Sequence, residues 1–285
     1  MPRVLIAGCG YLGQAVADLF GDSWDVEGWT KSSESAAQVS TKPYKVRAVD
    51  ISNEDVVRVQ KRNFDTVIHC ASTRGGDADS YERIYFAGAR NLLGQLSGRR
   101  LLFISSTSVY AQTTGEWVTE ASEVEPTHES GKILRKTEDL VLSKRGTVAR
   151  LAGIYGPGRS ALLRRLLNGE ATIDPESDRF VNQIHRDDGA SAIRLLIGKS
   201  ESAAQVYNVV DNEPIQLSEC YRWLATKLNR PIPPTARSTS SRKRGESNKR
   251  VSNAKLRGTG WAPKYPSFAF GMEKNVLPNL PRDGA

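Results

Sequence analysis

Three glycines near the start of the chain, Gly8, Gly10 and Gly13, have the spacing of a loop that holds a dinucleotide pyrophosphate. The first glycine permits a tight turn, the second lets the backbone approach the phosphates, and the third lets a helix pack against a strand. Tyr11 and Leu12 are further candidate contacts, because a helix N-terminus offers unpaired N–H groups and a positive dipole end. An apolar run over residues 3–7 and a helical pattern over 14–20 flank the loop, which favours a dinucleotide site over an ordinary glycine turn.

The segment Thr30-Lys31-Ser32, at the end of the next expected strand, bears on which dinucleotide binds. An acidic residue here would bind the adenosine ribose hydroxyls and select NAD, and none is present. A lysine flanked by hydroxyls suits a 2′-phosphate by charge and by hydrogen bonding. We therefore predict NADP as cofactor in preference to NAD. The alternative is that Lys31 is an exposed loop lysine without this role.

Two residues at and after the end of another expected strand could act on a substrate. Ser106 could orient a hydroxyl or carbonyl group, because strand C-termini face the ligand in sheets of this kind. Its alternative role is to cap backbone groups. Tyr110 could donate a proton if a cation lay nearby, and Lys132, Lys136 or Arg159 could supply that cation. Its alternative role is packing.

The elements that must position these residues alternate regularly between strands and helices. This alternation predicts an α/β fold, a doubly wound parallel-sheet Rossmann domain. We expect strands over residues 3–7, 25–30, 44–49, 64–71, 100–105 and 146–154, and helices over 14–20, 52–62, 80–96 and 129–143. The second half is less periodic, and there we expect helices over 160–167 and 217–228, a segment 182–196 that leads into a helix, and a strand over 206–210.

Composition bounds the class of protein. The 285 residues carry a net charge of +8, with 39% hydrophobic and 25% charged residues, which suits a globular protein. No apolar run approaches about 18 residues, and the first strand begins at once, so we expect neither a membrane span nor a leader, and a cytoplasmic location. Cys9, Cys70 and Cys220 form no metal-ligand spacing with the three histidines, which predicts reduced thiols and no metal site.

The positive charge is concentrated in residues 237–257, which hold eight Lys or Arg and one Glu. Three interpretations of this basic segment remain open: a solvated loop, a clamp for an anionic substrate, or a nucleic-acid contact. Because it contains no aromatic residue for base stacking, nucleic acid is the weakest of the three.

Several short segments together form a recognisable pattern. They are Gly8–Gly13, Asp50-Ile51, His69–Ser72, Ser105–Tyr110, Arg150–Gly158, Asn182–Asp188, Tyr207–Pro214 and Gly260-Trp261. With them the chain resembles, over nearly its whole length, the extended short-chain dehydrogenase/reductases, the epimerase and dehydratase group acting on nucleotide sugars. The resemblance implies a Rossmann domain of residues 1–155, to which 182–210 returns, and a substrate lobe of 156–181 and 211–285. A small polar or nucleotide-linked substrate is implied, and this fold often forms homodimers.

The resemblance also extends the set of expected cofactor contacts. It implies that Asp50 and Ile51 flank the adenine and that Ala71 and Ser72 line the cofactor. Three residues at strand ends complete the set of expected cofactor contacts: Cys70, Ser105 and Tyr155. Tyr155 is expected at the nicotinamide end.

The catalytic pair of this family, a tyrosine and a lysine four residues apart on one helix, has no counterpart in the expected helix over 129–143. Aligned on Gly131 and Glu138, the tyrosine position holds Ser130 and the lysine position holds Leu134. A serine hydroxyl has too high a pKa to replace the phenol, and leucine carries no charge. Lys132 points to nearly the opposite helix face.

Ser106 matches the family's serine or threonine, whereas the usual asparagine is replaced by Tyr85. The chain is therefore similar to an atypical subgroup that keeps the glycine motif and lacks the Tyr–Lys pair. Two hypotheses follow: an NAD(P)-dependent epimerase- or reductase-like enzyme with non-standard catalytic residues, or a catalytically silent NADP-binding regulatory protein. His185, Arg186 and the two aspartates after them are either a proton shuttle or a salt-bridged structural turn.

Overall fold

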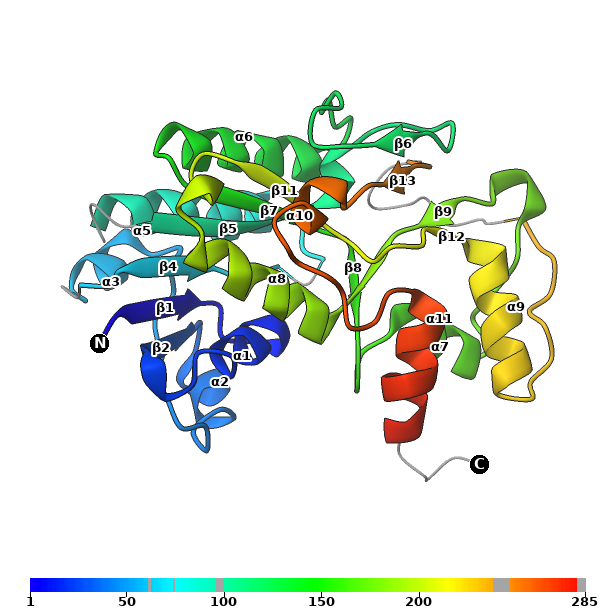
Figure 1. Cartoon of the computed structure of the whole chain (residues 1–285), viewed down its shortest axis with the longest axis horizontal. Helices are drawn as coiled ribbons and strands as arrows, with labels where there is room; N and C mark the ends of the chain where they lie inside the picture. Colours follow the sequence, from blue (N-terminus) through cyan, green and yellow to red (C-terminus); the bar gives the residue numbers. More distant parts are fainter. Residues whose placement is uncertain (61–62, 74, 96–99, 238–246, 281–285) are drawn as a thin grey trace.

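Seven parallel strands form one central sheet in the computed structural model, which describes residues 1–60, 63–73, 75–95, 100–237 and 247–280 (Figure 1). The order β3-β2-β1-β4-β5-β7-β11 reverses direction between β1 and β4, so the ligand crevice of such a sheet lies beyond the carboxyl ends of these two strands. The doubly wound prediction is therefore confirmed. The strands are β1 Arg3–Ala7, β2 Asp25–Thr30, β3 Lys45–Ala48, β4 Thr66–His69, β5 Arg100–Ser106, β7 Thr147–Leu151 and β11 Val206–Val209.

Helices cover both faces of the sheet (Figure 1). On one face α1 (Tyr11–Ala17) packs against α8 (Arg186–Gly198). On the other lie α3 (Glu54–Arg58), α5 (Gly88–Gln95) and α6 (Glu129–Ser143). The expected helix over 129–143 is confirmed residue for residue. The expected helix over 80–96 is a continuous helical stretch in three parts, α4 (Ala78–Tyr81), the π-helix η2 (Glu82–Ala87) and α5.

The strand expected over residues 146–154 is in fact two strands. β7 ends at Leu151, and the chain then leaves the central sheet as β8 (Gly153–Tyr155), which pairs with β10 (Gln183–His185). Both strands are apolar, so hydrophobicity alone gave no sign of the break. After the break the chain packs closely on residues 182–183: the amide of Gly153 donates to the carbonyl of Asn182 at 3.1 Å, and a Cβ at Gly153 would lie 2.8 Å from Nε2 of Gln183.

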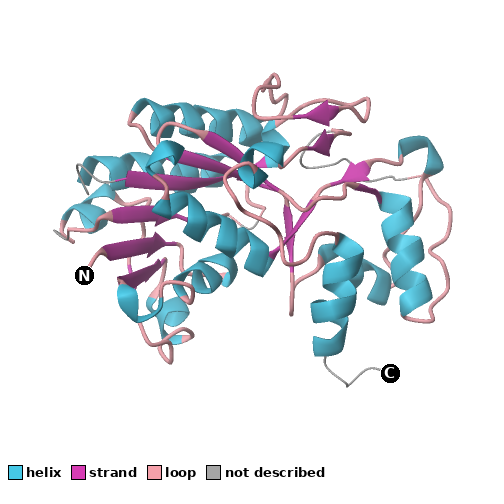
Figure 2. Ribbon diagram, viewed as in Figure 1, coloured by secondary structure: helices cyan, strands magenta, loops and turns pink. Residues whose placement is uncertain are grey.

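A second hydrophobic cluster lies apart from the sheet (Figure 2). Its helices are α7 (Ala161–Leu167), α9 (Leu217–Lys227) and α11 (Phe268–Gly271), the last continued by the π-helix η6 (Met272–Val276). Short ladders join β9 (Phe180–Val181) to β12 (Ile215–Gln216), and β6 (Trp117–Val118) to β13 (Arg250–Val251). The basic segment lies partly outside the described residues, and its remainder forms β13 and α10 (Ala254–Arg257). Among the described helices, none has the length and apolarity needed to cross a bilayer.

Candidate cofactor and catalytic site

The glycine loop follows β1 at the switch point of the sheet. Gly8 has φ +103°, and a Cβ there would lie 2.2 Å from the backbone nitrogen of Ala71. A Cβ at Gly13 would lie 2.4 Å from the carbonyl oxygen of Gly8. A Cβ at Gly10, in contrast, would meet no atom within 4 Å. Close packing thus requires glycine at positions 8 and 13, whereas Gly10 faces open space. This fits a loop that admits a pyrophosphate over Gly10.

Tyr11 extends this loop toward the segment after β8. Its hydroxyl donates to the carbonyl of Pro157 at 3.0 Å. The guanidinium carbons of Arg159 and Arg186 lie 5.4 and 5.0 Å from the centre of its ring. A cavity of about 270 Å³ opens beside Tyr11, and α1 and α8 form much of its wall. Arg159, expected near Tyr110, is therefore a neighbour of the glycine loop instead.

The turn after β4 closes the other side of the loop. The amide of Cys70 donates to the carbonyl of Ala7 at 2.7 Å, which joins the ends of the two strands. Burial raises the pKa of the Cys70 thiol to about 12 and that of Cys9 to about 11, so both thiols stay protonated at neutral pH. Ala71 follows directly with its backbone against Gly8, and Ser72 comes next in the chain.

The expected adenosine contacts also lie together. The ammonium of Lys31 is 3.9 Å from the carboxylate of Asp50, and 73% of the Lys31 side chain is exposed. Asp50 accepts hydrogen bonds from the amide and hydroxyl of Ser52 at 3.0 and 2.7 Å. The hydroxyl of Ser32 caps α2 (Ser33–Ala37), and the hydroxyl of Thr30 donates to the carbonyl of Ser32. Lys31 is therefore the charged side chain of the segment Thr30–Ser32, and it extends into solvent.

Ser105 and Ser106, at the end of β5, point to different partners. The Ser105 hydroxyl donates to Glu138 of α6 at 2.6 Å, so this side chain faces the helix and leaves only the backbone for a cofactor. The Ser106 hydroxyl accepts from the amide of Ser108 at 3.1 Å and begins the 3-10 turn η3 (Thr107–Val109). The capping role of Ser106 is thus observed, and it leaves the hydroxyl proton for a second partner.

Tyr110 is fully buried, and its hydroxyl is engaged on three sides. It donates toward the carbonyl of Thr119 and the side chain of Asn208, and accepts from the guanidinium of Arg150 at 2.8 Å. Burial raises the pKa of its phenol. The expectation that Lys132, Lys136 or Arg159 is its cation is wrong, because Arg150 holds that place. This position favours the packing role and gives no support to a proton donor.

Glu138 and Arg150 form a buried ion pair behind Ser105. Glu138 is fully buried, and Arg150 is 3% exposed. Two nitrogens of the guanidinium reach the carboxylate, at 3.0 and 2.6 Å. The pair fixes α6 over β5 and β7. Both residues stand in the sequence motifs, but nothing local to either motif showed that they meet.

The start of α6 carries the residues aligned with the family's catalytic pair. Leu134 is buried in the core, 3% exposed. Ser130 lies one turn earlier, and its Oγ is 3.0 Å from Nδ1 of His128. His128 is the N-cap of α6, and its Nδ1 also accepts from the amide of Gly131 at 2.8 Å. Sequence reasoning named Ser130 but missed His128, whose place two residues before Ser130 and at the helix start was the available signal.

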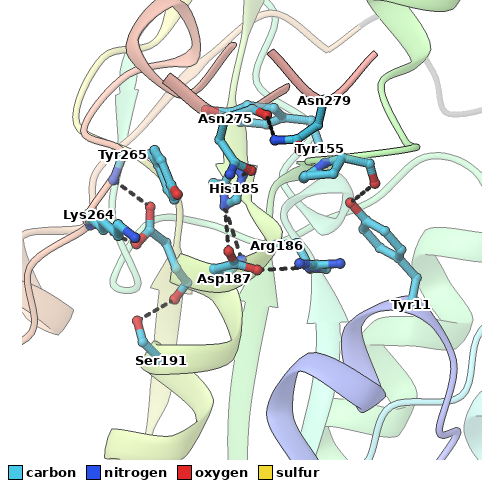
Figure 3. A network of polar contacts seen from close by, with 12 residues as sticks. Tyr11, Tyr155, His185, Arg186, Asp187, Ser191, Lys264, Tyr265, Asn275 and Asn279 are labelled. Carbon is cyan, nitrogen blue, oxygen red and sulfur yellow. Dashed lines mark hydrogen bonds and ion pairs between the residues drawn. The ribbon is translucent and has the colours of Figure 1, made fainter. Parts of the chain in front are cut away.

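The segment after β10 takes part in a network of polar contacts with residues near the end of the described chain (Figure 3). His185 is fully buried; its Nδ1 accepts from the amide of Asp187 at 3.2 Å, and its Nε2 lies 2.9 Å from Oδ1 of Asn275. The carboxylate of Asp188 accepts two backbone amides, from residues 264 and 265. These contacts are those of a structural turn. Tyr155 is buried in the second hydrophobic cluster and donates to the carbonyl of Ser267 at 3.2 Å, so its side chain is not a cofactor wall.

The described residues contain no group of three or more His, Cys, Asp or Glu side chains that could hold a metal ion. The parallel sheet, the switch point and the glycine loop define a Rossmann-type dinucleotide-binding protein. Comparison makes this specific: the NAD dependent epimerase/dehydratase family matches residues 4–209, and the chain belongs to that family. The family is defined as NAD dependent, and the open face of Gly10 fits a nicotinamide dinucleotide.

Solved structures agree with this assignment. A protein from Methylobacillus flagellatus, described as an NAD-dependent epimerase/dehydratase, is 30% identical, with a TM-score of 0.79 over 97% of this chain and 98% of that one. UDP-glucose 4-epimerase from Thermus thermophilus, solved with NAD, has a TM-score of 0.82 at 19% identity, covering 97% and 98% of the two chains. dTDP-glucose 4,6-dehydratase from Bacillus anthracis, also with NAD, has a TM-score of 0.80 at 16% identity, covering 97% and 96%. No curated protein matches the chain.

Proposed function

We propose that the chain is an NAD(P)-dependent epimerase- or reductase-like enzyme that acts on a small polar or nucleotide-linked substrate with non-standard catalytic residues. The observation that carries the proposal is the glycine loop, in which Gly8 and Gly13 are packed tightly and Gly10 is open. A bound nicotinamide supplies hydride transfer to or from a substrate carbon. Gly8–Gly13 and the turn 70–72 would hold the dinucleotide.

Ser106 is the residue we assign to the substrate. It lies at the carboxyl end of β5, on the same edge of the parallel sheet as the glycine loop. Its hydroxyl proton can donate to a substrate carbonyl or hydroxyl oxygen while its lone pair caps η3. Tyr110, the second candidate from the sequence, is left in its packing role.

NADP is the preferred cofactor in this proposal. β2 ends without a carboxylate, and Lys31 extends into solvent at the adenosine end of the site. Its neighbour Asp50 is 3.9 Å away, so a 2′-phosphate would compete with that carboxylate for the ammonium. A phosphate dianion is the stronger partner at neutral pH because of its larger charge.

A nucleotide-linked substrate is supported by relatives and by the lobe. The Thermus and Bacillus structures are named for enzymes of UDP-glucose and dTDP-glucose. In this chain Arg250 lies between two aromatic rings, 5.2 Å from the centre of Trp117 and 5.0 Å from that of Phe180. Lys249, next to it, donates to the carbonyl of Tyr110 at 2.9 Å. Lys249 is buried and holds the backbone, whereas the Arg250 guanidinium and the exposed ring of Trp117 suit a phosphorylated, base-containing ligand.

The second candidate is a cofactor-binding protein without catalysis. Leu134, aligned with the family's lysine, is apolar and buried, so it can neither hold the ribose nor assist a proton transfer. In that case cofactor binding would set a conformation that a partner recognises.

A binding and turnover assay distinguishes the two. NADPH and NADH are titrated first, and the purified protein is then mixed with NADP⁺ or NADPH and UDP-glucose, dTDP-glucose and simple carbonyl compounds, with nicotinamide absorbance and product formation followed. We expect tight NADPH binding and turnover that Ser106→Ala lowers by roughly 100-fold or more. Ser200→Ala, in an exposed turn far along the chain, is the matched control. Tight binding without turnover of any compound would support the silent binder, and failure to bind either nucleotide would refute both.

A further inference from the structure

The start of α6 brings an imidazole and a hydroxyl together at the site's edge. We infer that Ser130 and His128 form a proton relay, in which Ser130 Oγ contacts a substrate hydroxyl and passes a proton to His128 Nδ1. The inference rests on the proposed function. Ser130 and Leu134 occupy the positions of the family's catalytic tyrosine and lysine, so the proton-transfer step needs other groups, and the inference assigns them.

The direction of α6 places this pair beyond the end of β5. Glu138, in the middle of α6, contacts Ser105 near the end of β5, whereas the turn after α6 lies against the carbonyl of Leu101 near its start. The helix therefore runs opposite to the strand. Ser130 precedes Glu138 by eight residues, about 12 Å along the helix axis, at a rise of about 1.5 Å per residue. Along the direction of β5, Ser130 therefore lies beyond Ser106, at the same edge of the sheet as the glycine loop.

The face of the helix agrees with this placement. Ser130, Leu134 and Glu138 are four residues apart and share one face. Leu134 and Glu138 are buried against the sheet, so Ser130 continues the same face where the strands have ended. Ser130 is half-buried there, and α6 contacts the turn η3 that follows Ser106. The hydroxyl is therefore directed to the crevice side and is not on the outer surface of the helix.

The hydrogen bonds fix which group accepts a proton. The amide of Gly131 donates to Nδ1 of His128 at 2.8 Å, so this nitrogen carries a lone pair in the neutral ring. Ser130 Oγ, 3.0 Å from the same nitrogen, must then be the donor. Its own lone pairs remain for a substrate hydroxyl. In such an arrangement serine alone is too weak a base, and the imidazole supplies the acceptor.

The proposed step balances as a proton transfer coupled to oxidation of a carbinol. The substrate O–H bond breaks, its proton goes to Ser130 Oγ, and its electron pair forms the second bond between the oxygen and the carbinol carbon. The C–H bond of that carbon breaks, and its hydrogen leaves with the electron pair as a hydride. The former hydroxyl proton of Ser130 goes to His128 Nδ1, which becomes imidazolium. The oxidant for the carbon is the nicotinamide that the family requires. Transfer displaces the Gly131 amide from Nδ1 and puts a positive charge at a helix N-terminus, which favours return of the proton in the reverse step.

Both lysines in the first half of α6 form ion pairs with carboxylates. Lys132 binds Glu129 at 2.7 Å, and Lys136 binds Glu82 on η2 at 2.8 Å. η2 also carries the buried Tyr85 and Arg83, whose guanidinium donates to the hydroxyl of Ser80 at 3.3 Å. α4 carries Asp79 and the buried Tyr81 after its N-cap Asp77, and η3 has no ionisable residue. The imidazole is therefore the group we expect to govern proton transfer near neutral pH.

The test compares His128→Asn and Ser130→Ala with Ser143→Ala. Asparagine is a good N-cap and can still accept from the Gly131 amide, so the first variant removes the base and keeps the helix. Ser143 lies at the other end of α6 and bonds only the carbonyl of Leu140, so it is the matched control. We expect both relay variants to lower turnover at least about 100-fold, with the NADPH Kd within about twofold of wild type. Ser130→Thr, which keeps a hydroxyl, should recover most activity.

Two measurements distinguish a proton relay from a purely structural role of His128. They are the pH profile of turnover and the NMR signals of the imidazole nitrogens, which a structural role alone would not change. Wild type should lose turnover in acid as the imidazole becomes protonated, and His128→Asn should lose that limb. With ¹⁵N-labelled histidine, long-range correlation should show His128 protonated on Nε2, with an Nδ1 resonance that moves in Ser130→Ala. The chain has three histidines, so the spectrum of His128→Asn assigns the signal.

Three results would overturn the relay: wild-type turnover in either variant, an unchanged acid limb in His128→Asn, or a proton on Nδ1. Absence of turnover in wild type itself, with UDP-glucose, dTDP-glucose or the carbonyl compounds, counts against the proposed function. The ¹⁵N spectrum then shows separately whether Ser130 donates to Nδ1 of His128, because that measurement needs no turnover.

Discussion

Replacing Gly10 by alanine should separate cofactor binding from folding. A Cβ at this position would meet no atom within 4 Å, and the backbone φ of −95° lies outside the left-handed region that favours glycine. Alanine also lowers the entropy of the unfolded chain, so we expect the free energy of unfolding to change by about 1 kcal/mol or less. In a chain of this size that is a change in Tm of roughly 2–4 °C.

Cofactor binding should fall much more. The new methyl group would occupy the space through which a pyrophosphate approaches the backbone, and so would weaken charge-assisted hydrogen bonds of about 1.5–3 kcal/mol. The Kd for NADPH should therefore rise about 10- to 100-fold. Gly13→Ala behaves differently: its Cβ would lie 2.4 Å from the carbonyl oxygen of Gly8, and such overpacking costs about 1–3 kcal/mol of stability.

The assay pairs thermal unfolding without cofactor with titration of NADPH by its fluorescence. Gly94→Ala is the control for a glycine-to-alanine change, since Gly94 lies in α5 with no atom within 4 Å of its Cβ position. It should raise stability by about 1 kcal/mol and leave the Kd unchanged. If Gly10→Ala binds NADPH as tightly as Gly94→Ala, the pyrophosphate does not cross Gly10, and our assignment of the loop is refuted.

Three further changes test the cofactor preference and the buried charges. Lys31→Asp should shift the ratio of NADP to NAD affinity toward NAD by roughly 3- to 10-fold in equilibrium titrations, and unchanged relative affinities would remove the argument for NADP. Arg150→Met leaves the buried carboxylate of Glu138 without its cation and should cost about 3–5 kcal/mol in urea unfolding at pH 7; additive single effects in a cycle with Glu138→Gln would show that the pair is not coupled. Burial lowers the pKa of His69 from 6.5 to about 4, so the unfolded chain binds this proton first as the pH falls. The stability from a neutral His69 is complete above pH 6.5 and is lost toward pH 4, by about 3 kcal/mol, and His69→Gln should flatten this part of the pH profile in urea titrations.

Local sequence patterns were sufficient to predict most helices and strands and the glycine loop Gly8–Gly13. The helix over 129–143 follows from its apolar spacing, and the glycine roles follow from the lack of a Cβ at three positions. Parallel strands followed from alternation with helices. The sequence could not show the break at Ala152, because the apolar run continues through it and the pairing partner of β8 lies about 30 residues further on.

Side-chain partners were the part that local patterns could not supply. The cation beside Tyr110 is Arg150, forty residues away, and the partner of Ser105 is Glu138 on the next helix. Nearby lysines were reasonable candidates by sequence distance, but Lys132 binds Glu129 of α6 and Lys136 binds Glu82 of η2. The sheet register decides which of two consecutive serines, Ser105 or Ser106, turns toward the helix, and that register is set by distant strands.

The two functional hypotheses make different demands on α6. A protein that only binds a cofactor needs α6 to cover the sheet, which burial of Leu134 and the pairing of Glu138 with Arg150 already achieve. It needs only some acceptor for the Gly131 amide, and asparagine, aspartate or serine would serve as well as histidine. An enzyme also needs a group that takes up a proton near neutral pH beside the reacting carbon, and His128 adds that group. If His128→Asn folds and binds the cofactor as the wild type does, the two proteins differ only in proton transfer. A loss of turnover in this variant then favours the enzyme, and unchanged turnover removes the catalytic role of this helix.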